Sequence, residues 1–171
     1  MQNLSKDVQK IIRTLEKHQV QYVIVGGVGS ILQGADIFTR DIDVCPENNK
    51  ENFERLSEAL KELGGRLRGA TDVEVPITPE LLRNMQIGTW VTHFGDFDII
   101  HDIPAGENGA LFEYEQLYHN RKDVTFIGLV VHVASLENII VSKRFAGRAK
   151  DLAVLPELEE LLKKQQEEDQ G

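Results

Sequence analysis

The sequence is poor in the features that mark secreted and membrane proteins. Cys45 is the one cysteine among 171 residues, which excludes an internal disulfide and a sulfur-ligated zinc site. No run of about 18 apolar residues is present, so no membrane span is expected. The first residues, MQNLSKDVQK, lack an apolar signal core. We therefore expect a cytoplasmic protein with no membrane contact.

Positive charge is also scarce. The chain has 19 Lys and Arg against 28 Asp and Glu, a formal net charge of −9. A broad nucleic-acid-binding surface needs clustered positive charge, so this composition argues against one. A small basic site stays compatible with it, because basic residues gather late in the chain: Lys143, Arg144, Arg148 and Lys150.

Apolar residues follow a pattern that indicates one domain of irregularly alternating helices and strands. Helices are predicted over 4–15, 28–33, 52–63 and 135–146, followed by a last helix with Pro156 in its first turn. Strands are predicted over 22–25, 41–44, 89–92, 97–100 and within 124–133, while the rest of 66–92 gives no clear pattern. We predict an α/β (α+β) fold with one central sheet. The expected domain is 1–165, with a core over 20–134, C-terminal helices over 135–165 and a flexible acidic tail over 166–171.

A glycine pair, Gly26-Gly27, follows the apolar run Tyr22–Val25. A dinucleotide-binding fingerprint fails because Leu32 stands where its last glycine is required, and a P-loop fails because Ala35 replaces its lysine. What remains is a strand, two glycines and the start of a helix, where free N–H groups can bind a phosphate at close range. The alternative is an ordinary strand-to-helix turn, which is the commoner meaning of such glycines.

Two carboxylates, Asp41 and Asp43, lie inside the next apolar run. Residues two apart on a strand share a face, so both carboxylates point the same way. Their repulsion would be relieved by a divalent cation, and Mg²⁺ prefers hard oxygen ligands. The alternative is a solvated strand end with salt-bridged aspartates, for example to Arg40.

A second acidic strand follows at "HFGDFDIIHD", residues 93–102. Asp96 and Asp98 share one of its faces. If this strand lies beside Asp41-Ile42-Asp43, Asp98 completes a three-carboxylate cluster able to hold two metal ions. Asp96 competes with it for that role.

These residues resemble the nucleotidyltransferase superfamily related to DNA polymerase beta. Its signature is a hydrophobic residue followed by Gly-Gly or Gly-Ser, a spacer, and then Asp, a hydrophobic residue, Asp or Glu, and a hydrophobic residue. Val25-Gly26-Gly27 and Asp41-Ile42-Asp43-Val44 match it. "FTRDIDV" and "ASLENIIVSKRFAGRAKDLAVL" are similar to the small bacterial branch that includes AbiEii-type toxins and stand-alone nucleotidyltransferases. The resemblance covers roughly residues 22 to 155.

The resemblance implies a small mixed sheet with helices packed on one face and a helical C-terminus. It implies transfer of a nucleoside monophosphate from an NTP such as ATP to a hydroxyl acceptor, with release of pyrophosphate. Asp41, Asp43 and Asp98 would be catalytic and would hold two Mg²⁺ ions. The nucleotide-binding residues would be Gly26, Gly27 and Ser30.

The late helix adds Lys143 to this nucleotide-binding set. Lys143 shares the apolar face of Ile139 and Ile140, and an inward lysine needs an anionic partner such as a triphosphate or an active-site carboxylate. The alternative is a packed stem whose ammonium reaches water. Arg148 and Asp151, three residues apart, are interpreted as a structural ion pair.

Three hypotheses follow. The first is a Mg²⁺-dependent nucleotidyltransferase whose acceptor is a tRNA end, a protein hydroxyl or a small molecule; the acidic charge favours the last two. The second is a non-catalytic module that binds nucleotide or a partner, for example a toxin–antitoxin component. The third is a metal phosphohydrolase.

Overall fold

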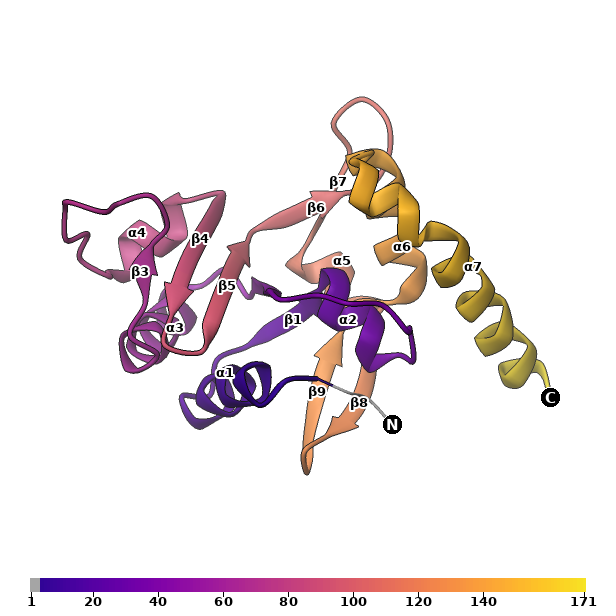
Figure 1. Ribbon diagram of the computed structural model, residues 1–171, viewed down its shortest axis with the longest axis horizontal. Helices are drawn as coiled ribbons and strands as arrows, with labels where there is room; N and C mark the ends of the chain where they lie inside the picture. Colours follow the sequence, from indigo (N-terminus) through magenta and orange to yellow (C-terminus); the bar gives the residue numbers. More distant parts are fainter. Residues whose placement is uncertain (1–3) are drawn as a thin grey trace.

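The computed structural model describes residues 4–171, and a mixed seven-stranded sheet forms its centre (Figure 1). The strand order across this sheet is β3-β4-β5-β2-β1-β9-β8, and β6 and β7 form a separate hairpin. The strands are β1 (Tyr22–Val25), β2 (Ile42–Pro46), β3 (Arg66–Leu67), β4 (Ile87–Thr92), β5 (Gly95–Ile100), β6 (Asp102–Pro104), β7 (Leu111–Glu113), β8 (Lys122–Phe126) and β9 (Leu129–Val133). The helices are α1 (Lys6–Lys17), α2 (Gly26–Leu32), α3 (Lys50–Glu62), α4 (Pro79–Asn84), α5 (Tyr114–His119), α6 (Leu136–Ala146) and α7 (Ala149–Gln170).

Strand pairing at the centre of the sheet brings the expected site residues together. β1 pairs with β2 in antiparallel register, with Val25 opposite Asp43. β2 pairs with β5 in parallel register, with Asp43 opposite Asp98. The glycine turn after β1, the carboxylates of β2 and those of β5 therefore meet at one place in the sheet.

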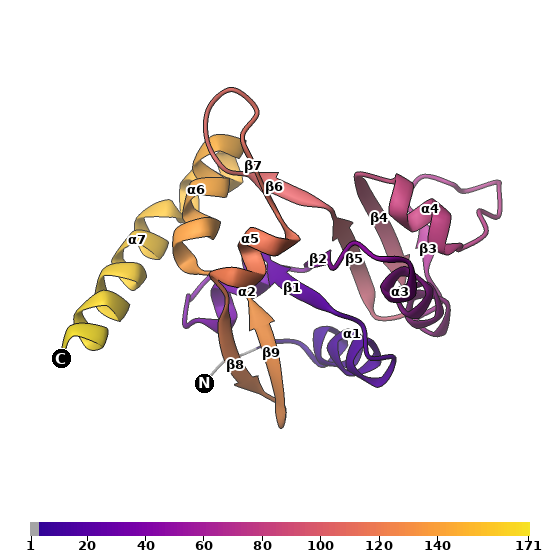
Figure 2. The same cartoon turned by 180° about the vertical axis from the view of Figure 1, so that it is seen from behind.

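Helices cover both faces of the sheet. In β1, Ile24 packs in a cluster that includes Leu60 of α3, whereas Val23 packs with Ile139 of α6 on the other face. Figures 1 and 2 show α1 and α3 grouped apart from α5, α6 and α7. The expectation of helices on one face is therefore wrong. β1 is apolar on both faces, as strands buried on both sides are.

The N-terminal end of α6 follows its capping signal. Ser135 Oγ accepts a hydrogen bond from Asn138 N at 3.2 Å, which confirms the predicted helix start. The same device starts α1, where Ser5 Oγ accepts from Val8 N at 3.2 Å. Each cap satisfies a backbone donor that the helix itself leaves free.

The last helix is longer than the sequence predicts. α7 begins at Ala149 and contains Pro156 in its interior, so the prediction of a last helix with Pro156 in its first turn is wrong. Pro156 lies on the exposed side, where the carbonyl that loses its donor can bind water. The helix also continues to Gln170 through residues expected to form a tail, and its far end projects away from the sheet (Figure 2). Within residues 4–171, no helix combines the length and apolar character that crossing a membrane requires.

Candidate active site

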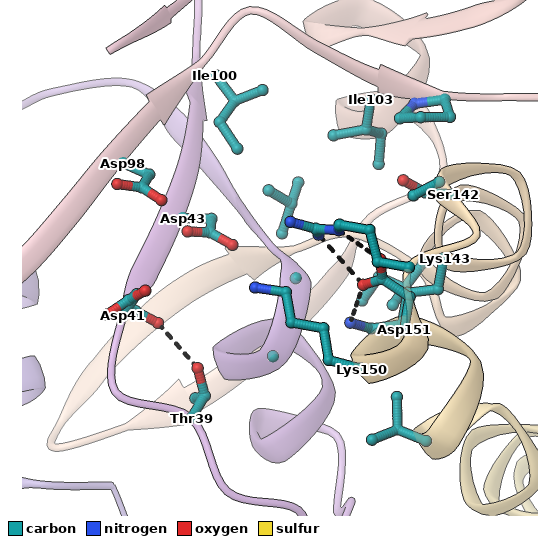
Figure 3. A pocket seen from close by; sticks show the side chains of 18 of the residues that line it. Thr39, Asp41, Asp43, Asp98, Ile100, Ile103, Ser142, Lys143, Lys150 and Asp151 are labelled. Carbon is teal, nitrogen blue, oxygen red and sulfur yellow. Dashed lines mark hydrogen bonds and ion pairs between the residues drawn. The ribbon is translucent and has the colours of Figure 1, made fainter. Parts of the chain in front are cut away.

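A cavity of about 550 Å³ lies over the ends of β2 and β5 (Figure 3). Its walls come from the start of α2, the loop over 37–41, strands β4 and β6, and the corner between α6 and α7. Asp41, Asp43 and Asp98 line it together, as the sequence pattern predicts for one shared face. Asp43 and Asp98 are direct neighbours on paired strands.

Burial and neighbouring carboxylates destabilise the charged forms of Asp43 and Asp98. Burial and the charge of Asp98 raise the pKa of Asp43 to about 7. Burial and the charge of Asp41 also raise the pKa of Asp98. Within the described residues, the buried Oδ1 atoms of Asp43 and Asp98 have no hydrogen-bond partner. Neighbouring acceptor oxygens without donors form a site that favours a cation.

The donor chemistry fits a divalent metal ion, although the side chains do not form a finished site. Across residues 4–171, no three Asp, Glu, His or Cys side chains are already arranged to hold a metal. Asp41 faces the same cavity as Asp43 and Asp98 (Figure 3) and supplies the same type of oxygen ligand. The alternative of aspartates salt-bridged to Arg40 is not what the structure contains, because that guanidinium lies over the Phe38 ring at 5.7 Å.

Asp96 and Asp98 have different surroundings. Asp98 lines the cavity, whereas Asp96 forms an ion pair with Arg68 and is not part of the lining. Asp96 lies next to Gly95, at the turn where β4 and β5 meet. The geometry therefore places Asp98, not Asp96, beside Asp43.

The glycine turn is built to let the backbone approach Asp43. Gly26 has φ +67°, and a Cβ there would lie 2.5 Å from Asp43 Oδ2. A Cβ on Gly27 would lie 2.9 Å from Thr39 Cβ. Both glycines line the cavity, and both positions exclude a side chain.

The structure does not bring Ser30 to the cavity. Ser30 is fully buried, and its hydroxyl donates to the carbonyl of Gly26 at 3.1 Å. One helical turn separates the two residues, so the serine bonds back along α2 instead of facing the carboxylates. The expected phosphate contact from Ser30 is thus not supported by its position.

A cluster of cations faces the carboxylates from the α6–α7 corner. Lys143 lines the cavity, with a side chain 15% exposed and Nζ 3.6 Å from Asp151 Oδ1. Arg148 donates to the two carboxylate oxygens of Asp151 at 2.6 and 3.2 Å, which confirms the predicted ion pair. Burial alone would raise the pKa of Asp151, but hydrogen bonds from Arg148 hold it below its ordinary value.

Lys150 is a cavity residue whose part in the site the sequence pattern did not predict. It lines the cavity, and Figure 3 shows its side chain pointing toward the carboxylates. Thr39 also lines it and donates from Oγ1 to the carbonyl of Asp41 at 3.3 Å. The clustering of basic residues late in the sequence could have indicated Lys150, whereas no feature of the sequence indicates that Thr39 belongs to the site.

Several solved structures with a similar fold are nucleotidyltransferases. The chain superposes on the lincomycin-bound lincosamide antibiotic adenylyltransferase LnuA with a TM-score of 0.64 at 14% identity, over 94% of this chain and 99% of that one. It superposes on a putative nucleotidyltransferase from Thermotoga maritima with a TM-score of 0.55 at 20% identity, covering 87% and 88%. ANT(2'')-Ia in complex with adenylyl-2''-tobramycin gives 0.56 at 17% identity, covering 88% and 84%. These similarities establish the nucleotidyltransferase fold.

The family follows from the sequence itself. The sequence model of the aminoglycoside-2''-adenylyltransferase family matches residues 7–153, so the chain belongs to that family and is a nucleotidyltransferase. No curated protein sequence matches it. The superfamily expected from the sequence is confirmed, while the narrower resemblance to AbiEii-type toxins stays a prediction.

Proposed function

We propose that the protein transfers a nucleoside monophosphate from an NTP to a hydroxyl group of a small molecule, with Mg²⁺ bound and pyrophosphate released. The observation that carries this proposal is the pair Asp43 and Asp98, which are neighbours on paired strands and line one cavity with Gly26 and Lys143. Anionic oxygens on one side and ammonium and guanidinium groups on the other match a metal-bound triphosphate.

Each group has a separate task in this proposal. Asp41, Asp43 and Asp98 would hold the metal ions, which when bound would neutralise charge on the phosphates and lower the pKa of the attacking hydroxyl. The backbone of Gly26 and Gly27 comes close to the triphosphate because no side chain intervenes. Lys143, Arg148 and Lys150 offset the negative charge that moves onto the leaving pyrophosphate.

The reaction at phosphorus is a substitution. The acceptor oxygen forms a bond to the α-phosphorus, and the bond from that phosphorus to the bridging oxygen breaks. The hydroxyl proton passes to Asp98, the cavity carboxylate that lies beside Asp43 on the paired strand. The pyrophosphate then leaves on the side of the cationic residues.

A small-molecule acceptor is favoured by the relatives. The related structures carry lincomycin or adenylyl-2''-tobramycin, and the cavity of about 550 Å³ has the size of a small-molecule site. The net charge of −9 opposes a tRNA acceptor. The presence of Asp98 in the cavity weighs against a module without turnover.

Thermal unfolding tests the nucleotide site directly. The melting temperature is measured with each of the four NTPs, with and without Mg²⁺, for the native chain and Asp43→Asn. A ligand at 100 times its Kd stabilises by about 2.7 kcal/mol, which is a shift of roughly 5–10 °C for a domain of this size. We expect such a shift with Mg²⁺ and its loss in Asp43→Asn.

Asp96→Asn is the matched control, because Asp96 lies on the same strand face but outside the cavity. It is expected to keep the full shift. If no NTP shifts the melting temperature of the native chain in the presence of Mg²⁺, the proposal is wrong. If the shift survives in Asp43→Asn, the metal lies elsewhere.

A further inference from the structure

The cavity has two unlike sides. The side formed by α6, α7 and the corner between them carries Lys143, Arg148 and Lys150, the groups assigned above to the phosphates. The opposite side is formed by β4, β5 and β6. We call this second side the apolar wall and define it by Ile87, Ile100, Ile103 and Pro104.

Strand register places the apolar wall beside Asp98. β4 and β5 pair with Ile87 opposite Ile100 and Thr89 opposite Asp98. Residues opposite each other in an antiparallel pair project from the same face, and so do residues two apart. Ile87 and Ile100 therefore continue the surface on which Asp98 lies, in the direction away from Asp43.

The apolar wall is open to a ligand. Ile87 is 60% exposed although it belongs to a strand of the main sheet. An exposed isoleucine inside a cavity and next to a second one is typical of a binding surface for an apolar group. The acceptor must reach Asp98 for its hydroxyl to react, so it must lie against this wall.

The charged residues around the apolar wall limit how much positive charge the acceptor can carry. Among the carboxylates that line the cavity, Asp41, Asp43 and Asp98 serve the metal, and Asp151 is bound by Arg148. Asp102 is the lining carboxylate that remains, and one of its oxygens accepts from Gln86.

The guanidinium of Arg68 further reduces the net negative charge on this side of the cavity. Arg68 lines the same side of the cavity, paired with Asp96. An acceptor with several ammonium groups needs several carboxylates to replace the water that it loses on binding. The apolar wall does not supply them.

We infer that the acceptor is a hydroxyl compound with one apolar face and at most one positive charge. Its apolar face lies on Ile87, Ile100 and Ile103, its charge, if present, is placed near Asp102, and its reacting hydroxyl lies at Asp98. This inference rests on the proposed function and names the substrate class of the same site. It separates this chain from enzymes built for polycationic sugars.

Calorimetry with two hydroxyl-bearing probes tests this inference. Lincomycin carries alkyl groups and a single basic nitrogen, whereas tobramycin carries several amino groups. Binding of each is measured with Mg²⁺ and the α,β-methylene analogue of the NTP that stabilises the protein most. Lincomycin is expected to bind at least about ten-fold more tightly than tobramycin, since apolar contact and unpaired charge act in opposite directions.

Substitution of one wall residue makes the test specific. Ile87→Ser is expected to weaken lincomycin binding about ten-fold and to leave binding of the nucleotide analogue unchanged. Ile87→Asp is expected to weaken lincomycin further and to strengthen tobramycin. The control is Val130→Ser, an equally exposed strand residue, 58% against 60%, that does not line the cavity.

Three results would overturn the inference while leaving the proposed function intact. These are tighter binding of tobramycin than of lincomycin, unchanged lincomycin binding in Ile87→Ser, and binding of neither probe by protein that binds the nucleotide analogue. Failure to bind the analogue with Mg²⁺ is a different result. It would remove the proposed function, and this inference with it.

Discussion

Gly26 and Asp43 are in such close contact that no side chain fits between them. A Cβ on residue 26 would lie 2.5 Å from Asp43 Oδ2, and Gly26 has a φ of +67°, which disfavours other residues. In the sequence, thirteen residues separate Gly27 from Asp41. In the fold, the backbone turn at Gly26 lies directly against the carboxylate of Asp43. The glycine is required by this contact as well as by its own conformation.

Gly26→Ala is expected to abolish nucleotide binding by pushing Asp43 out of place. The left-handed conformation alone costs roughly 1–2 kcal/mol of stability. Gly34→Ala is the control, because Gly34 also has a positive φ, of +107°, but its nearest neighbour is Leu161 Cδ1 at 3.6 Å. Chemical denaturation should find both variants destabilised, and the Mg²⁺-dependent NTP shift should vanish in Gly26→Ala alone. A retained shift in Gly26→Ala would contradict the role of this contact.

The pKa of Asp43 predicts how stability depends on pH without metal. A carboxyl whose pKa is about 7 when folded and about 3.9 when unfolded binds more protons in the folded state between these values. Stability therefore falls as pH rises from about 4 to 7, and the loss is complete above pH 7. The free energy of unfolding falls by on the order of a few kcal/mol over this pH range.

Urea unfolding at pH 5 and pH 8 in EDTA measures this loss. Asp43→Asn removes the titrating group, so its stability should change much less between the two pH values and should exceed that of the native chain at pH 8. Mg²⁺ should stabilise the native chain more at pH 8 than at pH 5, since the metal needs the ionised carboxylates. An equal pH dependence in the native chain and Asp43→Asn would show that Asp43 is not the group responsible.

Local pattern predicted the parts of the site that depend on one strand or one turn. Alternation along β2 placed Asp41 and Asp43 on one face, and the end of β1 at Gly26 followed from an apolar run and a glycine pair. Whether Asp98 or Asp96 lies beside them depends on the register of β5 against β2, which no local pattern contains. In the structure this register pairs Asp98 with Asp43.

Tertiary packing decided the features that the sequence could not predict. Ser30 is one turn beyond Gly26, and its burial depends on what α2 packs against. Pro156 normally marks a first turn, but the packing of Leu155 and Leu158 keeps α7 helical through it. The apolar wall is formed in part by β4, which lies at the end of the stretch that gave no clear pattern.

The different surroundings of Asp98 and Asp96 predict opposite effects of the same substitution. Under the proposed function Asp98→Asn removes a metal ligand and the proton acceptor, so kcat should fall about 10²–10⁴-fold while NTP binding persists. Asp96→Asn removes an exposed ion pair with Arg68, worth about 0–1 kcal/mol, and should leave kcat within about three-fold. Pyrophosphate release in the presence of an acceptor measures both. A larger loss in Asp96→Asn would reverse the assignment.

Asp151 offers a test of how the cationic residues are held. It is 2% exposed and lies 3.6 Å from Lys143 Nζ and 2.6 Å from Arg148 Nε. Asp151→Asn leaves both cations without a carboxylate partner, so they no longer have a fixed position facing the triphosphate. We expect the KM for NTP to rise about ten-fold and stability to fall by about 1–3 kcal/mol.

Arg144→Ala is the control for this test, because Arg144 lies on the same helix as Lys143 and pairs with Glu159 at the surface. It should cost about 0–1 kcal/mol and leave the KM for NTP unchanged. If Asp151→Asn lowers stability without changing the KM, Asp151 only joins α6 to α7. If the KM rises by the same factor in both variants, the general charge of the α6–α7 corner attracts the nucleotide, and the fixed positions of Lys143 and Arg148 do not matter.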